Sequence, residues 1–324
     1  MEQVKCDFCG GSDVEEVARQ TDLIHKTTSE EFCIVRCRQC GLNYVNPRPD
    51  SVEIGKYYSD EYSFHSNQTG AKLAVVSLLT RLANSPLYAL ATFIPGLGRR
   101  LIPYVKPRIE DPVRKYFQGG RILDIGCGSG ESAHFWGASG ALQAYRKFAE
   151  VHGLEVDDGA RQILEAKGIS AYKRLPDVPA ELKFDIIRMN WSLEHVHSPA
   201  DYFEFIARHL AEKGKAIISI PNYDGLIYTL ARDCVEVPIH LYHFRKRDIQ
   251  NYAGKFGLEI FSFRTFSYPQ MFAFAAEIFP GIRKCFSVPM SLSEAHHFQR
   301  TLSRLDAAEI GNDMIAILQK KSPS

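Results

Sequence analysis

The sequence has no excess of charge of one sign. Its 324 residues carry 39 Lys and Arg against 38 Asp and Glu, which gives a formal net charge of +1. Proteins that bind nucleic acid through its phosphate groups are usually strongly basic, so the overall charge does not favour such a partner. Residues 1–48 are slightly acidic, with six basic and eight acidic side chains and a net of 6 − 8 = −2. Binding of RNA by this part of the chain is therefore disfavoured as well.

A long uninterrupted hydrophobic run is also missing. The most apolar stretch, 71–97, is broken by charged residues and by Pro86, whereas a spanning helix needs about 20 nearly uncharged residues. The first five residues are polar, so we expect no signal peptide and a cytoplasmic location. Residues 71–110 combine apolar side chains with a net charge of 6 − 1 = +5. They are either helices on the inner face of a membrane, near a lipid-linked substrate, or a helical lid packed on the core.

The eight cysteines are not spaced like a secreted disulfide framework. Five of them lie in the first forty residues, and four of these form two C-x-x-C pairs separated by 27 residues. The four are Cys6, Cys9, Cys37 and Cys40. Two such pairs are the preferred ligand set of a structural zinc ion, which also stabilises a segment too short for its own core. We predict a zinc ribbon in which Cys33 is buried and not a ligand; a ribbon without metal and a redox pair are the alternatives.

What the chain does contain is a glycine-rich motif at 122–130, with the sequence ILDIGCGSG. Its first residues predict a short buried parallel strand, with Asp124 inside it. Gly126, Gly128 and Gly130 then predict a turn at which the backbone can approach a polar ligand. A second strand is predicted at 151–156. It ends in Glu155, whose carboxylate can accept hydrogen bonds from the hydroxyl groups of a ribose.

The rest of the chain continues the alternation of strands and helices. Further strands are predicted at 120–125, 169–172, 184–190, 216–222, 257–261 and 313–318. Helices are predicted at 131–149, 158–167 and 199–211, with a Lys-Gly turn after the last of these.

This order of motifs resembles that of class I S-adenosylmethionine-dependent methyltransferases. The shared features are Asp-x-Gly-x-Gly-x-Gly after the first strand, an acid after the second, Leu-Glu-His-Val after the fourth and Pro-Asn after the fifth. The resemblance implies an α/β fold with a Rossmann-like seven-stranded sheet and a bound S-adenosylmethionine. It implies cofactor contacts by Asp124, Gly126, Gly128, Gly130, Glu155, Asn190 and Trp191.

The join after the second cysteine pair, with the sequence GLNYVNPRP, resembles a bacterial group of such enzymes that modify sugars and cell-surface polysaccharides. We expect a zinc ribbon at 1–48, a helical linker or lid at 49–118 and a methyltransferase domain at 119–324. A helical insert over the active face is expected at about 267–300. We expect no counterpart of the C-terminal domain of sugar C-methyltransferases, which disfavours C-methylation.

Three histidines are the predicted catalytic residues: His195, His240 and His243. A neutral hydroxyl nucleophile needs a base that takes its proton, and histidine suits this role near neutral pH. His195 follows the fourth strand, where open α/β sheets bind ligands. The stretch PIHLYHF, which contains the other two, is expected to begin the helix before the sixth strand and to close over the acceptor. A buried structural pair is the alternative for these two histidines.

Some related O-methyltransferases hold a divalent metal with Glu-x-x-Glu-His. Here Trp191 stands three residues before Glu194, and this departure argues against a catalytic metal. His240 or His243 could supplement Glu194 and His195.

The predicted function is methyl transfer from S-adenosylmethionine to a hydroxyl of a sugar, nucleotide-sugar or lipid-linked glycan. The alternatives are O-methylation of a small aromatic or quinone, and a non-catalytic zinc scaffold that binds the cofactor. No nucleic acid is expected as a partner.

Overall fold

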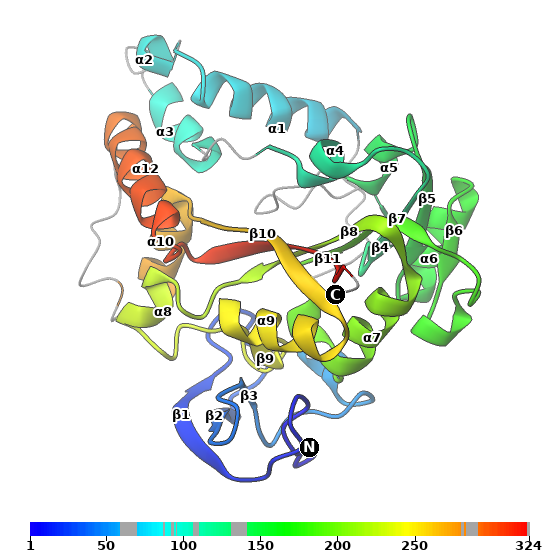
Figure 1. Ribbon diagram of the computed structural model, residues 1–324. Helices are drawn as coiled ribbons and strands as arrows, with labels where there is room; N and C mark the ends of the chain where they lie inside the picture. The colour runs from blue at the N-terminus through cyan, green and yellow to red at the C-terminus, as the bar shows by residue number, and fades with distance from the viewer. Residues whose placement is uncertain are drawn as a thin grey trace.

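A computed structural model of the protein describes most of the chain. The described residues are 1–58, 70–86, 88–91, 94, 96–105, 110–130, 141–279, 282 and 291–322. They form a central sheet with helices on both faces, and a small sheet that contains the N-terminal residues (Figure 1). A group of helices lies at the end of the molecule opposite to the small sheet (Figure 1).

The central sheet has seven strands in the order β10-β11-β8-β7-β4-β5-β6. Their bounds are β4 Arg121–Ile125, β5 Glu150–Leu154, β6 Ser170–Tyr172, β7 Phe184–Asn190, β8 Leu210–Pro221, β10 Leu258–Phe266 and β11 Asp313–Lys320. The strands from β4 to β8 pair in parallel, while β11 is antiparallel to both of its neighbours. This order confirms the predicted α/β fold with a Rossmann-like seven-stranded sheet.

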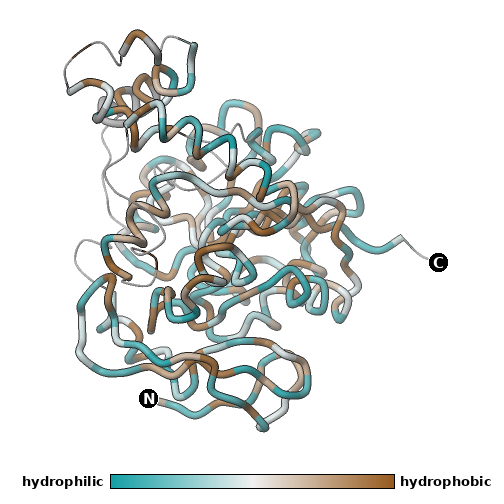
Figure 2. The backbone as a smooth tube through the Cα atoms, turned by 90° about the vertical axis from the view of Figure 1, so that its left-hand side faces the viewer, coloured by the Kyte–Doolittle hydropathy of each residue, from teal (hydrophilic) through white to brown (hydrophobic). Residues whose placement is uncertain are grey.

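Alternating apolar side chains give the sheet two buried faces. In β4, Leu123 and Ile125 join one hydrophobic cluster and Ile122 joins another, because successive side chains of a strand point to opposite faces. Helices α7 and α9 cover the first face, and α4, α5 and α6 cover the second. Their bounds are α4 Pro112–Tyr116, α5 Leu142–Tyr145, α6 Asp158–Ala166, α7 Pro199–His209 and α9 Lys246–Lys255. Figure 2 shows the hydrophobic stretches running through the interior.

The small sheet takes its fourth strand from the distant part of the chain. Its order is β1-β2-β3-β9, with bounds β1 Val14–Thr21, β2 Glu31–Cys37, β3 Asn43–Val45 and β9 Tyr242–His243. Strand β3 is antiparallel to β9, with Asn43 opposite His243. Side chains of β2 also reach two clusters that contain residues beyond 200, one through Val35 and the other through Ile34. The predicted ribbon therefore shares its core with the large domain.

The remaining helices pack with one another at one end of the sheet. Their bounds are α1 Gly70–Ala83, α2 Tyr88–Ala91, α3 Leu97–Leu101, α8 Leu226–Leu230, α10 Pro269–Ile278 and α12 Leu292–Ala307. Ala83 and Leu101 pack against Ala295 of α12, and the ring of Tyr88 stacks on His296 with centroids 3.7 Å apart. The segment predicted as a lid thus packs on the insert helix α12. Within the described ranges, no helix has both the length and the apolar composition needed to cross a membrane.

Several predicted boundaries differ from the structure. The stretch containing His240 and His243 does not begin a helix, because β9 lies within it and α9 starts only at Lys246. The predicted Lys-Gly turn lies inside β8, at an irregularity of its pairing with β7. Strand β5 ends one residue before Glu155, and α12 extends the insert to Ala307. The first ten residues of the predicted helix 131–149 lie outside the described part of the chain.

Candidate active site

The glycine turn follows β4 at the carboxyl edge of the parallel strands. Gly126, Gly128 and Gly130 have positive φ values of 75°, 54° and 73°, which other residues adopt only at a cost. A Cβ atom on Gly126 would lie 2.6 Å from the Cβ of Ser192. The Ser192 hydroxyl donates a hydrogen bond of 2.9 Å to the carbonyl of Ile125. The turn is therefore packed directly against the segment that follows β7.

Glu155 contacts this turn. Its Oε2 accepts a hydrogen bond from the N–H of Gly128 at 2.8 Å, and its Oε1 accepts one from the N–H of Asp157 at 3.0 Å. The side chain is buried, and burial raises the pKa of its carboxyl group. Two residues predicted to bind the cofactor, Gly128 and Glu155, thus lie together; hydrogen bonding of Glu155 to a ribose stays a prediction.

Asp124 is engaged within the sheet. The Nε of Arg188 in β7 donates to its Oδ1 at 2.9 Å, and the Nη2 contacts the other carboxylate oxygen. Arg188 was not predicted from the sequence, although an arginine within the apolar run 186–189 was the available signal. The visible role of Asp124 is to hold this arginine below the glycine turn, and its contact with the cofactor stays a prediction.

Asn190 and Trp191 stand where β7 ends. Asn190 is the last residue of β7 and lies opposite Ser219 of β8, and Trp191 has a φ of 56° that is uncommon for a large side chain. The Oδ1 of Asn190 and the Nε1 of Trp191 are buried without a hydrogen-bond partner among the described residues. Buried polar atoms are normally satisfied, so both side chains suit contact with a bound molecule.

Glu194 and His195 lie in the single 3-10 turn Leu193–His195 that follows. Glu194 is only 1% exposed, and neither carboxylate oxygen has a hydrogen-bond partner in the described part of the chain. Burial raises the pKa of Glu194 to about 8. The Nδ1 of His195 lies 3.0 Å from the carbonyl oxygen of Ile239 and 3.3 Å from the hydroxyl of Tyr58. Because a carbonyl only accepts, Nδ1 carries the proton and Nε2 is the acceptor in the neutral ring.

The structure brings His240 against His195. Their rings meet edge to face, with centroids 4.6 Å apart. His243 lies in β9, with its ring centroid 5.3 Å from that of Tyr223. Burial lowers the pKa values of His240 and His243 to about 3, so both rings are neutral at neutral pH. Of the three predicted histidines, His195 and His240 thus form one cluster with Glu194. His243 lies outside this group, in strand β9.

Glu236 and His25 extend this cluster toward the ribbon, and sequence analysis missed both. The Nε2 of His25 lies 2.5 Å from Oε1 of Glu236, and Oε2 of Glu236 lies 3.2 Å from Nε2 of His240. Burial alone would raise the pKa of Glu236, but the nearby imidazole groups of His240 and His25 lower it to about 2. The i, i+4 spacing of Glu236 and His240 was the one local signal.

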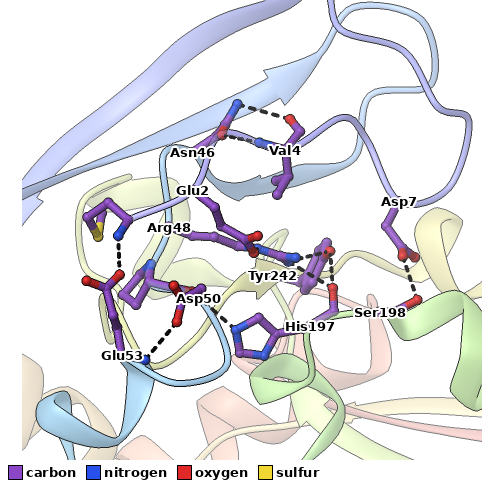
Figure 3. A network of polar contacts seen from close by, with 12 residues as sticks. Glu2, Val4, Asp7, Asn46, Arg48, Asp50, Glu53, His197, Ser198 and Tyr242 are labelled. Carbon is purple, nitrogen blue, oxygen red and sulfur yellow. Dashed lines mark hydrogen bonds and ion pairs between the residues drawn. The ribbon is translucent and has the colours of Figure 1, made fainter.

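The ribbon holds the loops that carry these residues. Arg48 donates from Nη1 to the carbonyl of His197 and to the hydroxyl of Tyr242, both at 2.9 Å. Figure 3 shows Arg48 between Glu2, the second residue of the chain, and these two groups. On the same side, the carboxylate of Asp7 accepts from the Ser198 hydroxyl at 3.0 Å (Figure 3). The loop after β7 and strand β9 are therefore both fixed by the ribbon.

The four predicted zinc ligands are gathered in the ribbon. The Sγ atoms of Cys6 and Cys40 are 3.4 Å apart, those of Cys9 and Cys37 are 3.5 Å apart, and all four lie within 4.8 Å of one another. Sulfur atoms around a tetrahedral zinc ion with bonds of about 2.3 Å are about 3.8 Å apart. Cys33 is buried and is not part of this group, as predicted. The donor set and its geometry fit Zn²⁺.

Residues 99–262 match the model of a protein family described as a methyltransferase domain. The chain belongs to this family. The matched region of the methyltransferase contains the glycine turn, Glu155 and the cluster of Glu194, His195 and His240. It confirms the predicted enzyme class, a class I S-adenosylmethionine-dependent methyltransferase. A comparison with curated proteins finds no match.

Three solved S-adenosylmethionine-dependent methyltransferases are similar to this one. The Thermotoga maritima protein is 15% identical, with 76% of this chain and 99% of that chain covered and a TM-score of 0.42. The Clostridium acetobutylicum protein is 12% identical, with coverages of 78% and 100% and a TM-score of 0.40. The Archaeoglobus fulgidus protein is 18% identical, with coverages of 73% and 100% and a TM-score of 0.42.

Proposed function

We propose that this methyltransferase acts on a hydroxyl group of a sugar, a nucleotide-sugar or a lipid-linked glycan. The proposal is carried by a set of side chains with buried polar atoms that have no hydrogen-bond partner among the described residues. They are Glu194, Ser219, His243 and Asp313. A molecule with several hydroxyl groups can satisfy them, because each hydroxyl both donates and accepts. A small aromatic acceptor would leave most of them unsatisfied, at about 1–3 kcal/mol for each group.

The sheet supports one common location for several of these groups. Asn190 lies opposite Ser219 across β7 and β8, and Asp313 begins β11 opposite Pro221 of β8. Because β11 is antiparallel, its first residue lies at the edge where the parallel strands end. Ligands of open α/β sheets bind outside this edge.

The side of the site near β4 suits the cofactor. S-adenosylmethionine, when bound, supplies an electrophilic methyl group. The turn at Gly126, Gly128 and Gly130 lets the ligand approach the backbone, and Glu155 offers a carboxylate next to it. Asn190 and Trp191 offer a further acceptor and a further donor. The main task of these residues is to hold donor and acceptor in line.

The three histidines are proposed as catalytic residues on the acceptor side. A hydroxyl group gives up its proton as it becomes methylated, so a neutral imidazole close to it assists the reaction. His195 is the first candidate for this base, because it follows β7 and its Nε2 is the acceptor nitrogen. His240 and His243 would bind or orient the acceptor.

We further propose that the ribbon binds zinc and that the protein is cytoplasmic, with a possible contact to the inner face of the membrane through 71–110. We expect Zn²⁺ on Cys6, Cys9, Cys37 and Cys40. A cytoplasmic protein that touches the inner face of the membrane through 71–110 would use the exposed side chains of α1 and α2 and of Ile94. These are Val75, Leu78, Leu90 and Ile94. Flotation with anionic lipid vesicles tests this contact, and absence of flotation would leave the lid interpretation.

The experiment that tests the function uses methyl-labelled S-adenosylmethionine. The purified protein is incubated separately with nucleotide-sugars, lipid-linked glycans and small phenols, and the product is analysed by NMR. We expect an O-methyl group on the sugar. Label found only in the phenols would contradict a sugar acceptor and favour a small aromatic acceptor. Cofactor binding with no transfer to any acceptor would favour the scaffold alternative.

A further inference from the structure

We propose that the sugar acceptor carries a primary ammonium group, which binds between the buried carboxylates of Glu194 and Asp313. The inference rests on the proposed function, because it names the chemical class of acceptor for the same site. Glu194 is 1% exposed and Asp313 is fully buried. None of their four carboxylate oxygens has a hydrogen-bond partner among the described residues.

The two carboxylates are unfavourable in these positions without a ligand. Burial raises the pKa of Glu194 to about 8, and the charge of Glu236 adds to the rise. Burial also raises the pKa of Asp313 well above its usual range, and the charges of Glu194 and Asp306 act in the same direction. A buried carboxylate is strongly disfavoured unless an opposite charge or hydrogen-bond donors compensate it. An ammonium group supplies both, since it carries a positive charge and three N–H donors.

Asp313 projects from the same face of the central sheet as Ser219. Asp313 lies opposite Pro221 of β8, and Ser219 is two residues before Pro221, so the two side chains share one face. Diagonal neighbours of this kind are about 7–8 Å apart. The hydroxyl oxygen of Ser219 is buried and has no hydrogen-bond partner in the described part of the chain. Ser219 can therefore accept a third hydrogen bond from the ammonium group, beside the two carboxylates.

The backbone around Asp313 is fixed. Asp313 is the first residue of β11, which pairs with β8 on one side and with β10 on the other. The N–H of the preceding residue, Asn312, donates to the hydroxyl of Ser267 at 3.0 Å. The side-chain Oδ1 of Asn312 accepts from the N–H of Ile227 at 2.9 Å. The carboxylate of Asp313 is therefore held in the interior and is already in place when the acceptor binds.

Two tyrosines lie within electrostatic range of Asp313. Burial, and after it the charge of Asp313, raises the pKa values of the Tyr228 and Tyr268 hydroxyls. For Tyr228 the charge of Glu194 acts in the same direction, so this residue is near both carboxylates. The faces of aromatic rings attract ammonium groups. The surroundings of the two carboxylates therefore suit an organic cation.

The position of Asp313 favours the acceptor as the source of the ammonium group, although S-adenosylmethionine also has one. The glycine turn follows β4 and Glu155 follows β5, so the proposed cofactor position extends from β4 toward β5. Asp313 begins β11, which lies three strands from β4 in the opposite direction. With about 4.8 Å between neighbouring strands, Asp313 is about 14 Å from the strand that carries the glycine turn.

The ammonium group positions the acceptor and does not react. A nitrogen that stays protonated has no lone pair, so the nucleophile is a hydroxyl group of the same sugar. The hydroxyl oxygen takes the methyl group from the sulfur of the cofactor, and its proton passes to His195. A carboxylate oxygen of Glu194 lies within 4.8 Å of a ring nitrogen of His195. An ammonium group bound to Glu194 therefore places the sugar ring next to this base.

The test is an NMR binding titration of the protein saturated with S-adenosylhomocysteine, so that no methyl transfer occurs. The sugar ring is common to all proposed acceptors, so the probes are methyl glycosides with a free amino group at C2, C3 or C4. Each is compared with its hydroxyl and N-acetyl counterparts. We expect at least one amine to bind about 10- to 100-fold more tightly than both counterparts, because charged hydrogen bonds are gained.

The variants D313N and E194Q remove one charge each and keep the shape of the side chain. The preference for the amine should fall by about tenfold or more in each of them. The control is D224N, the same substitution at an exposed position after β8, which should keep the preference. The affinity for S-adenosylmethionine should stay unchanged in D313N. Thermal unfolding of each variant establishes that it is folded, and the comparison of probes in the wild type needs no variant.

Equal affinity of the wild type for the amines and their counterparts would overturn the ammonium site. Weaker binding of S-adenosylmethionine by D313N with an unchanged amine preference would also overturn it, and would assign the carboxylate to the ammonium group of the cofactor. An N-methyl product would overturn it too. Methyl transfer to a hydroxyl of a neutral sugar, without any amine preference, would support the proposed function and remove the ammonium site. Amine preference without transfer to any hydroxyl would support the ammonium site and remove the proposed function.

Discussion

Asp124 and Arg188 form a buried ion pair between β4 and β7, and the side chain of each is 4% exposed. The pair lies directly below the glycine turn, so it connects the cofactor side of the site to the strand that leads to Glu194. The Nε of Arg188 donates to Oδ1 of Asp124 at 2.9 Å, and the guanidinium also lies over the ring of Tyr145. The acidic residue of the glycine-rich motif therefore has a visible structural partner.

Replacing Arg188 with Met should destabilise the protein by about 3–5 kcal/mol, because it leaves the Asp124 carboxylate buried without its partner. Chemical denaturation measures the change. The double variant D124N/R188M should recover part of the loss, since no charge then stays buried. The exposed pair of Arg208 and Glu204 provides the control, and E204Q should change stability by less than about 1 kcal/mol. Similar losses in R188M and E204Q would contradict a special role for the buried pair.

Gly126→Ala should lower both stability and cofactor affinity. The new Cβ would lie 2.6 Å from the Cβ of Ser192, on a residue with a φ of 75°. The strained backbone alone costs about 1–2 kcal/mol, and the contact adds to it. Thermal unfolding and calorimetric titration with S-adenosylmethionine measure the two effects. Gly254→Ala is the matched control, because this glycine lies in α9 and a Cβ there meets nothing within 4 Å. That variant should be as stable as the wild type or slightly more so.

Cys37→Ala should reduce the zinc content from about one ion per chain to near zero, because three thiolates hold the ion far more weakly than four. Elemental analysis measures it. Because β3 pairs with β9, the segment carrying His240 and His243 should lose protection from hydrogen exchange at the same time. Cys33→Ala removes a buried thiol outside the group of four and should keep the zinc. Full zinc occupancy in C37A would argue against the proposed ligand set.

Arg48→Gln should weaken the docking of the ribbon by about 1.5–3 kcal/mol, since a charged donor to two buried acceptors is lost. Limited proteolysis of residues 1–48 and chemical denaturation both report this change. Arg38 is half-exposed and pairs with Asp13 at the surface, so R38Q is expected to behave like the wild type. Equal effects of both substitutions would show that Arg48 is not the anchor.

Asp306 should make stability depend on pH. Burial raises the pKa of this carboxyl group to about 6, above the value of about 3.9 for an unfolded chain. The folded protein thus holds a proton that the unfolded chain releases, and the free energy of unfolding should fall as pH rises from about 4 to about 6. After discounting for the partial exposure of Asp306, we expect the free energy of unfolding to fall by about 1 kcal/mol over this range. Unfolding of wild type and D306N across this range measures it, and identical slopes would exclude Asp306 as the cause.

The strands of the central sheet could be predicted from the sequence because each strand is marked by residues within it or directly after it. Each buried strand is a short apolar run, and glycines or polar residues mark its end, as at Gly126 and Glu155. The methyltransferase resemblance then implied that these strands form one Rossmann-like sheet of seven strands. The helix expected at 238–244 was wrong, because the pairing of β9 with β3 depends on residues about 200 positions away.

The candidate site was predictable only in part for the same reason. His195 and His240 could be selected as single residues, but their contact with Glu194 depends on the meeting of two loops. Glu236 and His25 carry no distinctive motif, and the ion pair between them forms only after the ribbon has docked. Arg188 was not predicted because the resemblance had already assigned its partner, Asp124, a contact with the cofactor.

The pairing of β3 with β9 affects how the chain is made. During synthesis, β3 and the rest of the small sheet leave the ribosome about 200 residues before β9 does. At roughly 5–20 residues per second, this corresponds to about 10–40 s in which β3 is paired with β2 on one side and has no neighbouring strand on the other. The unpaired backbone N–H and C=O groups of an edge strand can form hydrogen bonds with a strand of another chain. The small sheet is therefore exposed to such pairing until β9 has been made, and we expect early binding of zinc by the four cysteines to stabilise it during this time.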